Sequence, residues 1–154
     1  MRLLNLIVVI IPVFLSCQET KENKKYNVTM SDSEWKKVLP RLSYNVLRRS
    51  YTETAFSSSY NFNKKSGYYV CRGCNKPLYS SENKYDSGSG WPSFDREIKN
   101  NVEYDVDYKI GYPRTELKCS NCGGHLGHMF NDGPSNTTGK RHCINGAALI
   151  FIEK

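Results

Sequence analysis

The pattern of hydrophobic and polar positions divides the chain into an apolar start, a polar stretch and a longer region of mixed pattern. After Arg2, residues 3–15 are almost all apolar, whereas residues 18–29 are polar and show no periodicity. The apolar run is too short to cross a bilayer, which takes about 20 apolar residues, and it has the layout of an export signal. The sequence predicts a signal peptide at 1–17, a flexible tether at 18–29 and one folded domain at 30–154.

The predicted domain opens with helical spacing. Ser31 and Glu34 match a capping box. Apolar residues then recur at helical intervals, namely Trp35, Val38, Leu39 and Leu42. Because Pro40 interrupts this pattern, the sequence predicts one short helix or two.

From Gly67 onward the pattern becomes that of extended chain. Apolar residues alternate strictly with polar ones at Val102, Tyr104, Val106, Tyr108 and Ile110, which indicates a strand with one buried face. The run from Ala147 to Ile152 is apolar, rich in β-branched or aromatic residues and too short for a buried helix, so it predicts a central strand. The domain is therefore expected to be mainly β.

Composition and charge narrow the class of partner. The chain is 38% hydrophobic and 12% aromatic, which is enough for a core, and its 22 basic against 15 acidic residues give a net charge of +7. Charge alone does not select a partner. However, Lys21, Lys24 and Lys25 directly follow the apolar run, where basic residues commonly lie beside a membrane. This placement argues against a nucleic-acid partner.

The end of the apolar run carries a cysteine. Phe14-Leu15-Ser16-Cys17 resembles the lipobox of bacterial lipoproteins, although Phe14 stands where Leu is usual. The resemblance implies that Cys17 is lipidated and that the domain is anchored in the bacterial cell envelope, facing the periplasm or the exterior. An uncleaved anchor and a plain secretory signal with an incidental cysteine are the alternatives. Each of these predicts an exported domain.

Four further cysteines form two matching C-x-x-C pairs, Cys71 with Cys74 and Cys119 with Cys122. Thiolates two residues apart on a tight turn point the same way, so two such pairs can surround one tetrahedral Zn²⁺. Disulfides are the alternative, because an exported protein meets an oxidising compartment. Two matching pairs favour a structural zinc site, with no open position for substrate and with folding that depends on the metal.

The remaining cysteine, Cys143, lies between Arg141-His142 and Ile144-Asn145. Neighbouring cationic groups favour the reactive thiolate, but a buried and inert cysteine is an equally good interpretation of these residues.

Two other clusters carry possible chemistry. His125 and His128 lie in a glycine-rich segment next to the second cysteine pair, where they could be catalytic, hydrogen-bonded core residues or spare metal ligands. Trp91 follows the glycine-rich turn Ser87-Gly88-Ser89-Gly90 and is either semi-exposed or a core residue.

Taken together, the motifs resemble those of the methionine-R-sulfoxide reductases of the B type. The resemblance runs from about Met30 to Lys154. Its motifs are Glu53-Thr-Ala-Phe-Ser57, both C-x-x-C pairs, Tyr85-Asp-Ser-Gly-Ser-Gly-Trp91-Pro-Ser-Phe94, His125-Leu-Gly-His128-Met-Phe-Asn-Asp132-Gly-Pro134 and Arg141-His-Cys143-Ile-Asn145. It implies two antiparallel sheets with short N-terminal helices, and a structural four-cysteine zinc site away from the chemistry.

The resemblance also implies the reaction and its residues. Cys143 attacks the sulfur of methionine-R-sulfoxide, free or protein-bound, and becomes a sulfenic acid. His125 and His128 bind or protonate the sulfoxide oxygen, Arg141 favours the thiolate, Asp132 orients a histidine and Asn145 arranges the site. Trp91 and Phe94 form the substrate-binding pair, with Trp91 facing the S-methyl group.

Departures from the family pattern shape the remaining expectations. Ser89 stands where many relatives have a resolving cysteine, so an external small thiol or thioredoxin-like protein is expected to reduce the sulfenic acid. His142 replaces an aromatic residue, and Gly146 stands where relatives often have Ser. A monomer is expected, since nothing in the sequence indicates more.

Two alternatives from other functional classes remain open. One is a basic, aromatic zinc-ribbon-like module that binds a nucleic acid or a protein without catalysis, which the predicted signal disfavours for nucleic acid. The other is a degenerate envelope scaffold or methionine-sulfoxide binder, which the intact Arg141, Cys143 and Asn145 disfavour.

Overall fold

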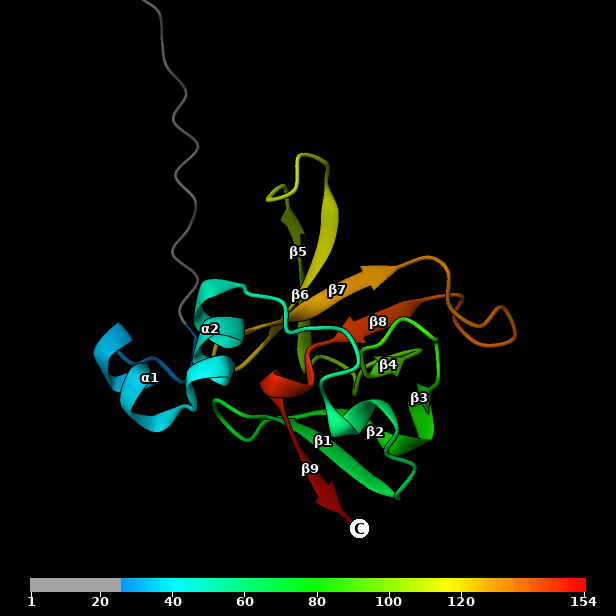
Figure 1. Ribbon diagram of the computed structural model, residues 1–154, viewed down its shortest axis with the longest axis horizontal. Coiled ribbons are helices and arrows are strands. Elements are labelled where there is room, and N and C mark those ends of the chain that lie inside the picture. The colour runs from blue at the N-terminus through cyan, green and yellow to red at the C-terminus, as the bar shows by residue number, and fades with distance from the viewer. Residues whose placement is uncertain (1–25) are drawn as a thin grey trace, which may run out of the picture.

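The computed structural model describes residues 26–154 (Figure 1). The predicted signal peptide with Cys17, and the predicted tether up to residue 25, lie outside the described residues. Within residues 26–154, no helix is both long and apolar enough to cross a membrane.

Chain contacts begin a few residues before the predicted domain start. The Val28 amide donates to the Asn121 carbonyl over 3.0 Å, and Val28 packs against the core. Because Asn121 lies inside the second C-x-x-C pair, the end of the predicted tether is in contact with this turn.

Two helices open the domain, as the sequence allowed. Helix α1 spans Asp32–Val38 and is capped by Ser31, whose side chain and Glu34 form the predicted capping box. Helix α2 spans Arg41–Arg49 and directly follows Pro40. Proline ends α1 because it has no N–H to donate, and it is tolerated before α2, where amides have no helical partner.

The rest of the described chain consists of strands joined by turns and longer loops. The strands are β1 (Gly67–Cys71), β2 (Pro77–Ser80), β3 (Lys84–Tyr85), β4 (Ser93–Phe94), β5 (Val102–Asp107), β6 (Arg114–Cys119), β7 (His125–Phe130), β8 (Arg141–Ile144) and β9 (Leu149–Glu153). Three short 3₁₀ turns are η1 (Ser59–Asn61), η2 (Ser81–Asn83) and η3 (Gly146–Ala148).

These strands form two antiparallel sheets, which confirms the expected fold class. One sheet has the order β2-β1-β9 and the other has the order β3-β4-β8-β7-β6-β5. The buried core takes side chains from both helices and both sheets, among them Trp35, Leu47, Tyr69, Phe94 and Leu126. One core therefore holds the whole described domain together.

Two strand predictions were wrong in detail. The run from Ala147 to Ile152 is not a central strand: its first two residues belong to η3, and β9 pairs only with β1 at the edge of the small sheet. The strand predicted from Val102 onward ends at Asp107 and is also an edge strand.

The apolar face of β5 is mostly exposed, in contrast to the prediction. Val102 is buried, but Tyr104, Val106, Tyr108 and Ile110 are exposed. Figure 1 shows the reason, since the β5–β6 hairpin projects from the body of the domain and only its base reaches the core. Alternation indicates that one face of a strand is apolar, but it does not determine how far the core extends along that face.

Candidate active site

The four paired cysteines converge in one cluster, with their sulfur atoms all within 4.8 Å of one another. Cys71 is the last residue of β1 in the small sheet, and Cys119 is the last residue of β6 in the large sheet. Each pair sits on a tight turn, closed by the Cys74 amide on the Cys71 carbonyl and by the Gly123 amide on the Cys119 carbonyl. The cluster therefore joins the ends of the two sheets.

The spacing of these sulfur atoms fits a metal site. Sγ of Cys71 lies 3.7 Å from Sγ of Cys122, and Sγ of Cys74 lies 3.5 Å from Sγ of Cys119. Four sulfurs at about 2.3 Å from a tetrahedral Zn²⁺ stand about 3.8 Å apart, whereas a disulfide bond is only about 2.0 Å long. None of the four forms a disulfide bond. The donor set and its geometry thus agree with the predicted structural metal site.

Outside the cysteine cluster, the side chains that could react or bind substrate lie in one row across the large sheet. Directly paired residues share a face of a sheet, and the register pairs Glu116 with His128, His128 with Cys143, and Cys143 with Ser93. Strands β6, β7, β8 and β4 thus present these side chains side by side. Asp107 and Arg114 are paired two residues further along the same face.

A bulge brings the two histidines to this face together. In a regular strand, residues three apart point to opposite faces. The register between β6 and β7 shifts so that Leu117 pairs with Gly127 and Lys118 with His125, which leaves Leu126 as an extra residue. Both imidazoles consequently lie on one side, with ring centroids 5.3 Å apart.

His128 is held by a carboxylate that the sequence analysis missed. Its Nε2 lies 2.8 Å from Oδ2 of Asp107, and Arg114 contacts the same oxygen at 2.6 Å. Burial raises the pKa of Asp107, but hydrogen bonds from the Lys109 amide, His128 and Arg114 outweigh it and bring the pKa to about 2. Burial lowers the pKa of His128 below its ordinary value, against the opposing effect of Asp107, so its imidazole is neutral at pH 7.

His125 has its own carboxylate partner. Its Nδ1 lies 2.6 Å from Oε1 of Glu116, while its Nε2 is buried and has no hydrogen-bond partner within the described residues. Burial raises the pKa of Glu116, but the His125 hydrogen bond and the charges of His125 and Lys118 lower it overall. Both histidines are therefore oriented by carboxylates on neighbouring strands.

Cys143 opens into a small hollow of about 120 Å³. The residues that line it are Thr52, Trp91, Arg114, Gly127, His128, Phe130, Cys143 and Asn145. Small-molecule sites in proteins usually measure roughly 300 to 1,000 Å³, so this hollow fits a single side chain better than a cofactor.

The thiol of Cys143 is not acidic at rest. Burial raises its pKa, and this effect exceeds the opposing effects of the Ser89 hydroxyl, 3.8 Å from Sγ, and of the Arg141 guanidinium. Arg141 therefore lowers the pKa of Cys143, as expected, but not enough to make the thiolate the main form. At neutral pH the domain therefore holds a thiol next to a neutral imidazole.

Trp91 and Asn145 are fixed by one buried residue, Glu53. The Trp91 Nε1–H donates to the Glu53 carbonyl over 3.1 Å, and Oδ1 of Asn145 accepts from the Glu53 amide over 2.9 Å. The Glu53 carboxylate in turn accepts from the amides of Gly146 and Ala147. The Glu53 segment therefore sets the position of the indole and of the turn after β8.

Two expected site residues have other roles. Phe94 is fully buried and stacks on Tyr79 at a centroid distance of 4.3 Å, because its register partner is His142 and this pair faces away from Cys143. Asp132 does not orient a histidine: its carboxylate makes a bidentate pair with Arg141, with both contacts at 2.8 Å. Asp107 and Glu116 contact the imidazoles instead.

His142 also lies on the face opposite to Cys143. Its ring makes edge contacts with Tyr79 and Tyr104, and burial lowers its pKa to about 4. It is thus a neutral core residue in the place of an aromatic one.

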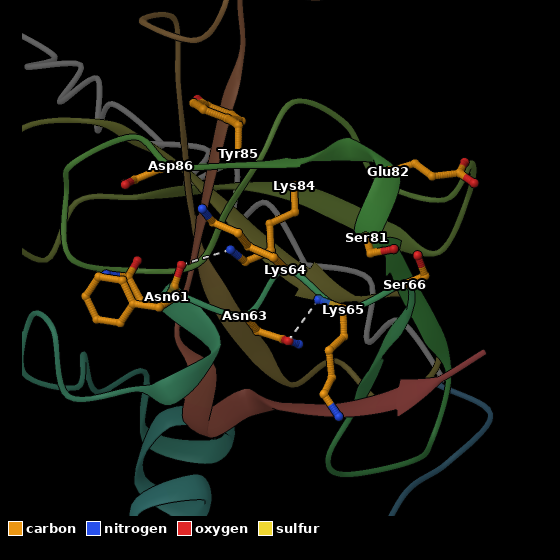
Figure 2. Close-up of a pocket in the computed structure, with 11 residues that line it drawn as sticks. Asn61, Asn63, Lys64, Lys65, Ser66, Ser81, Glu82, Lys84, Tyr85 and Asp86 are labelled. Carbon is orange, nitrogen blue, oxygen red and sulfur yellow. Dashed lines mark hydrogen bonds between the residues drawn. The ribbon is translucent and has the colours of Figure 1, made fainter.

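A larger cavity lies elsewhere in the described structure. Figure 2 shows this cavity of about 460 Å³, which shares no lining residue with the hollow at Cys143. Lys64, Lys65 and Lys84 line it, but Lys65 pairs with Glu153 and Lys84 donates to the Asn61 carbonyl. With no cysteine or histidine in its walls, this cavity contains none of the predicted chemistry.

Comparisons with known proteins agree with this geometry. Residues 39–153 match the SelR domain family. The chain is 50% identical over 127 residues to the peptide methionine sulfoxide reductase MsrB of Leptospira interrogans, covering 82% of this chain and 96% of that protein. It is 46% identical to the mouse mitochondrial methionine-R-sulfoxide reductase B3, covering 88% of this chain and 53% of that protein.

A nematode relative extends the range of the match. The probable methionine-R-sulfoxide reductase B of Caenorhabditis elegans is 41% identical over 144 residues, covering 92% of this chain and 93% of that protein. The resemblance inferred from the motifs is confirmed, and the chain belongs to the SelR domain family, the B-type methionine-R-sulfoxide reductases.

Proposed function

We propose that the described domain reduces methionine-R-sulfoxide to methionine with Cys143 as the nucleophile. The observation that carries the proposal is the meeting of Cys143, His128 and Trp91 in one hollow of about 120 Å³. This space suits one side chain of a peptide, and its walls offer a thiol, a base and an aromatic face. The family membership supports the same reaction.

The substrate would enter with its S-methyl group against Trp91. A sulfur–aromatic contact contributes about 0.3 to 1.5 kcal/mol. Because a sulfoxide sulfur is chiral, the fixed indole and the His128 imidazole in the same hollow would distinguish the two epimers. Trp91 is therefore proposed as the substrate-binding residue, without Phe94.

The proton for the sulfoxide oxygen would come from the Cys143 thiol. His128 Nε2–H donates to Asp107, so Nδ1 of the neutral ring is free to accept that proton. Asp107 then stabilises the resulting imidazolium, which protonates the oxygen as the thiolate attacks the sulfoxide sulfur. The oxygen ends on Sγ as a sulfenic acid, the Cys143 sulfur loses two electrons and the methionine sulfur gains them.

The other predicted residues would support this step. His125, anchored by Glu116, packs against His128 and is proposed to hold it in place. Arg141, paired with Asp132, opposes the burial effect on Cys143. Asn145 uses its amide to join the Glu53 segment to the Leu126 carbonyl and so fixes the turn after β8.

Zinc is the proposed ion at Cys71, Cys74, Cys119 and Cys122. When bound there, it would supply a structural cross-link between the ends of the two sheets, because four sulfurs complete its tetrahedral coordination. The atoms that react in the proposed reduction belong to the Cys143 site and not to the zinc site.

An external thiol is proposed to regenerate the enzyme. A small thiol or a thioredoxin-like protein would condense with the sulfenic acid to a mixed disulfide and water, and a second thiol would release Cys143 as thiol and the reductant as disulfide. Ser89, 3.8 Å from the nucleophile, cannot form that bond. The proposal includes a monomeric domain, lipid-anchored through Cys17 in the bacterial cell envelope, with no nucleic-acid partner.

The test is a direct assay of both epimers. The zinc-loaded domain is incubated with dithiothreitol and a peptide that carries either the R or the S epimer of methionine sulfoxide, and methionine is quantified. The proposal predicts methionine from the R epimer alone and none from Cys143→Ser. A binding module or an inactive scaffold would release no methionine from either epimer.

A further inference from the structure

Exposed apolar side chains gather on the β5–β6 hairpin. Within the described residues, large exposed hydrophobic side chains occur at five positions of this hairpin: Tyr104, Val106, Tyr108, Ile110 and Tyr112. Three of them occupy the loop between the strands, where Tyr108 is 68% exposed, Ile110 49% and Tyr112 59%. Single exposed apolar residues are ordinary on protein surfaces, but a cluster on a projecting loop marks a contact surface.

This loop directly adjoins the edge of the Cys143 hollow. The residues on either side of it are Asp107, which holds His128, and Arg114, which lines the hollow. Asp107 and Arg114 close the base of the loop with an ion pair of 2.6 Å. Figure 1 shows the hairpin standing out from the domain beyond β7 and β8, the strands of His128 and Cys143.

A second segment extends the same surface. The Lys109 side chain in the loop donates to the Ser50 carbonyl over 2.9 Å. The next residue, Tyr51, is 51% exposed, and Thr52 after it lines the hollow. We name the surface formed by Tyr51, Tyr108, Ile110 and Tyr112 the aromatic rim.

We propose that the aromatic rim binds the apolar residues on either side of methionine sulfoxide in an oxidised, partly unfolded protein. This inference rests on the proposed function and names its substrate class. The hollow admits one side chain, so the rest of a polypeptide must lie outside it, against the adjoining surface. The rim adjoins the hollow along the chain, because Tyr51 directly precedes Thr52 and the loop ends at Arg114, and both Thr52 and Arg114 line the hollow.

The chemistry of the substrate matches that of the rim. Methionine is mostly buried among apolar residues, and its oxidation places a polar group in that core and disrupts it. A damaged protein therefore presents its sulfoxide within an apolar segment. Tyr side chains bind such segments well, because they offer large apolar area with few rotatable bonds and retain a polar tip for water.

The experiment compares two substrates. One is an R-sulfoxide peptide with Leu, Val and Phe around the sulfoxide, and the other is a single methionine-R-sulfoxide residue blocked as N-acetyl methylamide. The triple variant Tyr108→Ser, Ile110→Ser, Tyr112→Ser is expected to raise KM for the peptide about tenfold at unchanged kcat. Its kcat/KM for the blocked residue is expected to stay within about twofold of wild type.

A control variant separates binding from general surface change. The matched triple Phe62→Ser, Tyr68→Ser, Ile152→Ser removes exposed apolar side chains that lie outside the Cys143 hollow. It is expected to leave KM for the peptide unchanged. The proposal is overturned if the rim variant loses the same activity on both substrates, or if it loses activity on neither of them. It is also overturned if the only effect of the variant is to dissociate a dimer seen by sedimentation. Failure of wild type to reduce either substrate would instead overturn the proposed function.

Discussion

The described domain carries cysteine sulfur in two settings that differ in almost every physical respect. At the ends of β1 and β6, four sulfur atoms crowd within 4.8 Å of one another. In the middle of β8, Cys143 stands alone among nitrogen and oxygen groups, with His128 as its register partner and the Ser89 hydroxyl 3.8 Å away. The residue type is the same, and the neighbours determine whether sulfur binds metal or attacks an electrophile.

The two settings also differ in how they are placed. The C-x-x-C pairs lie on turns at strand ends, where they join two sheets. Cys143 lies inside a sheet, so its neighbours are set by register across four strands. We therefore expect changes at the first site to act on stability and changes at the second to act on chemistry.

The largest expected effect is on folding. Structural zinc binding supplies about 10 kcal/mol or more in small zinc domains, so Cys119→Ser, or removal of the metal by a chelator, is expected to unfold most of the domain. Circular dichroism and metal analysis at neutral pH give the measurement. A Cys119→Ser protein that retains both its fold and its activity would show that the cluster is dispensable.

Replacing Cys143 should lower activity without changing stability. Cys143→Ser is expected to lower kcat/KM by more than about 10³-fold, because a hydroxyl cannot accept the oxygen as a sulfenic acid. Bound zinc and the thermal unfolding midpoint should stay near the wild-type values. A serine variant with substantial activity would assign the reaction to another group.

The carboxylate behind His128 provides a sharper test within the second site. Asp107→Asn is expected to lower kcat/KM about 10- to 100-fold, because an amide stabilises the imidazolium less well than a carboxylate. Asp132→Asn is the matched control and should stay within about threefold of wild type, since Asp132 pairs with Arg141. Equal losses in both variants would contradict the assignment of Asp107.

The dependence of activity on pH follows from the shifted pKa values of His128 and Cys143. One transferable proton is shared by Cys143 and His128, so kcat/KM should be level between their two pKa values. It should fall as pH drops through the pKa of His128, which burial lowers, because a protonated imidazole cannot accept the thiol proton. It should fall again as pH rises through the pKa of Cys143, which burial raises, because no proton then remains for the oxygen.

A further pH measurement separates the two groups. Asp107 raises the pKa of His128, so Asp107→Asn should move the acid limb to lower pH and leave the alkaline limb in place. A profile that rises steadily from neutral to alkaline pH, with no plateau, would indicate that the thiolate acts without the imidazole.

Local features of the domain could be predicted from the sequence. The capping box at Ser31, the stop at Pro40 and the two C-x-x-C turns each depend on residues a few positions apart. The long-range features could not. Asp107 and Glu116 contact the histidines through strand register and a bulge at Leu126, which no short motif encodes.

The prediction for Phe94 failed for the same reason. Trp91 and Phe94 are close in sequence and share one family motif, but Phe94 is in strand β4 and its register places it on the opposite face from Cys143. The exposure of Tyr104 and Val106 likewise depends on how far the core extends, which the alternation of residues does not reveal.

The most direct test of the central claim follows the oxygen atom. A peptide carrying methionine-R-sulfoxide with isotopically labelled oxygen is mixed with the zinc-loaded domain in the absence of reductant. The sulfenic acid is captured with a reagent that retains its oxygen, and the cysteines are analysed by mass spectrometry. The account predicts one labelled oxygen on Cys143, equal in amount to the methionine released, and none on the four clustered cysteines. Methionine formed without label on Cys143, or label on any other cysteine, would contradict it.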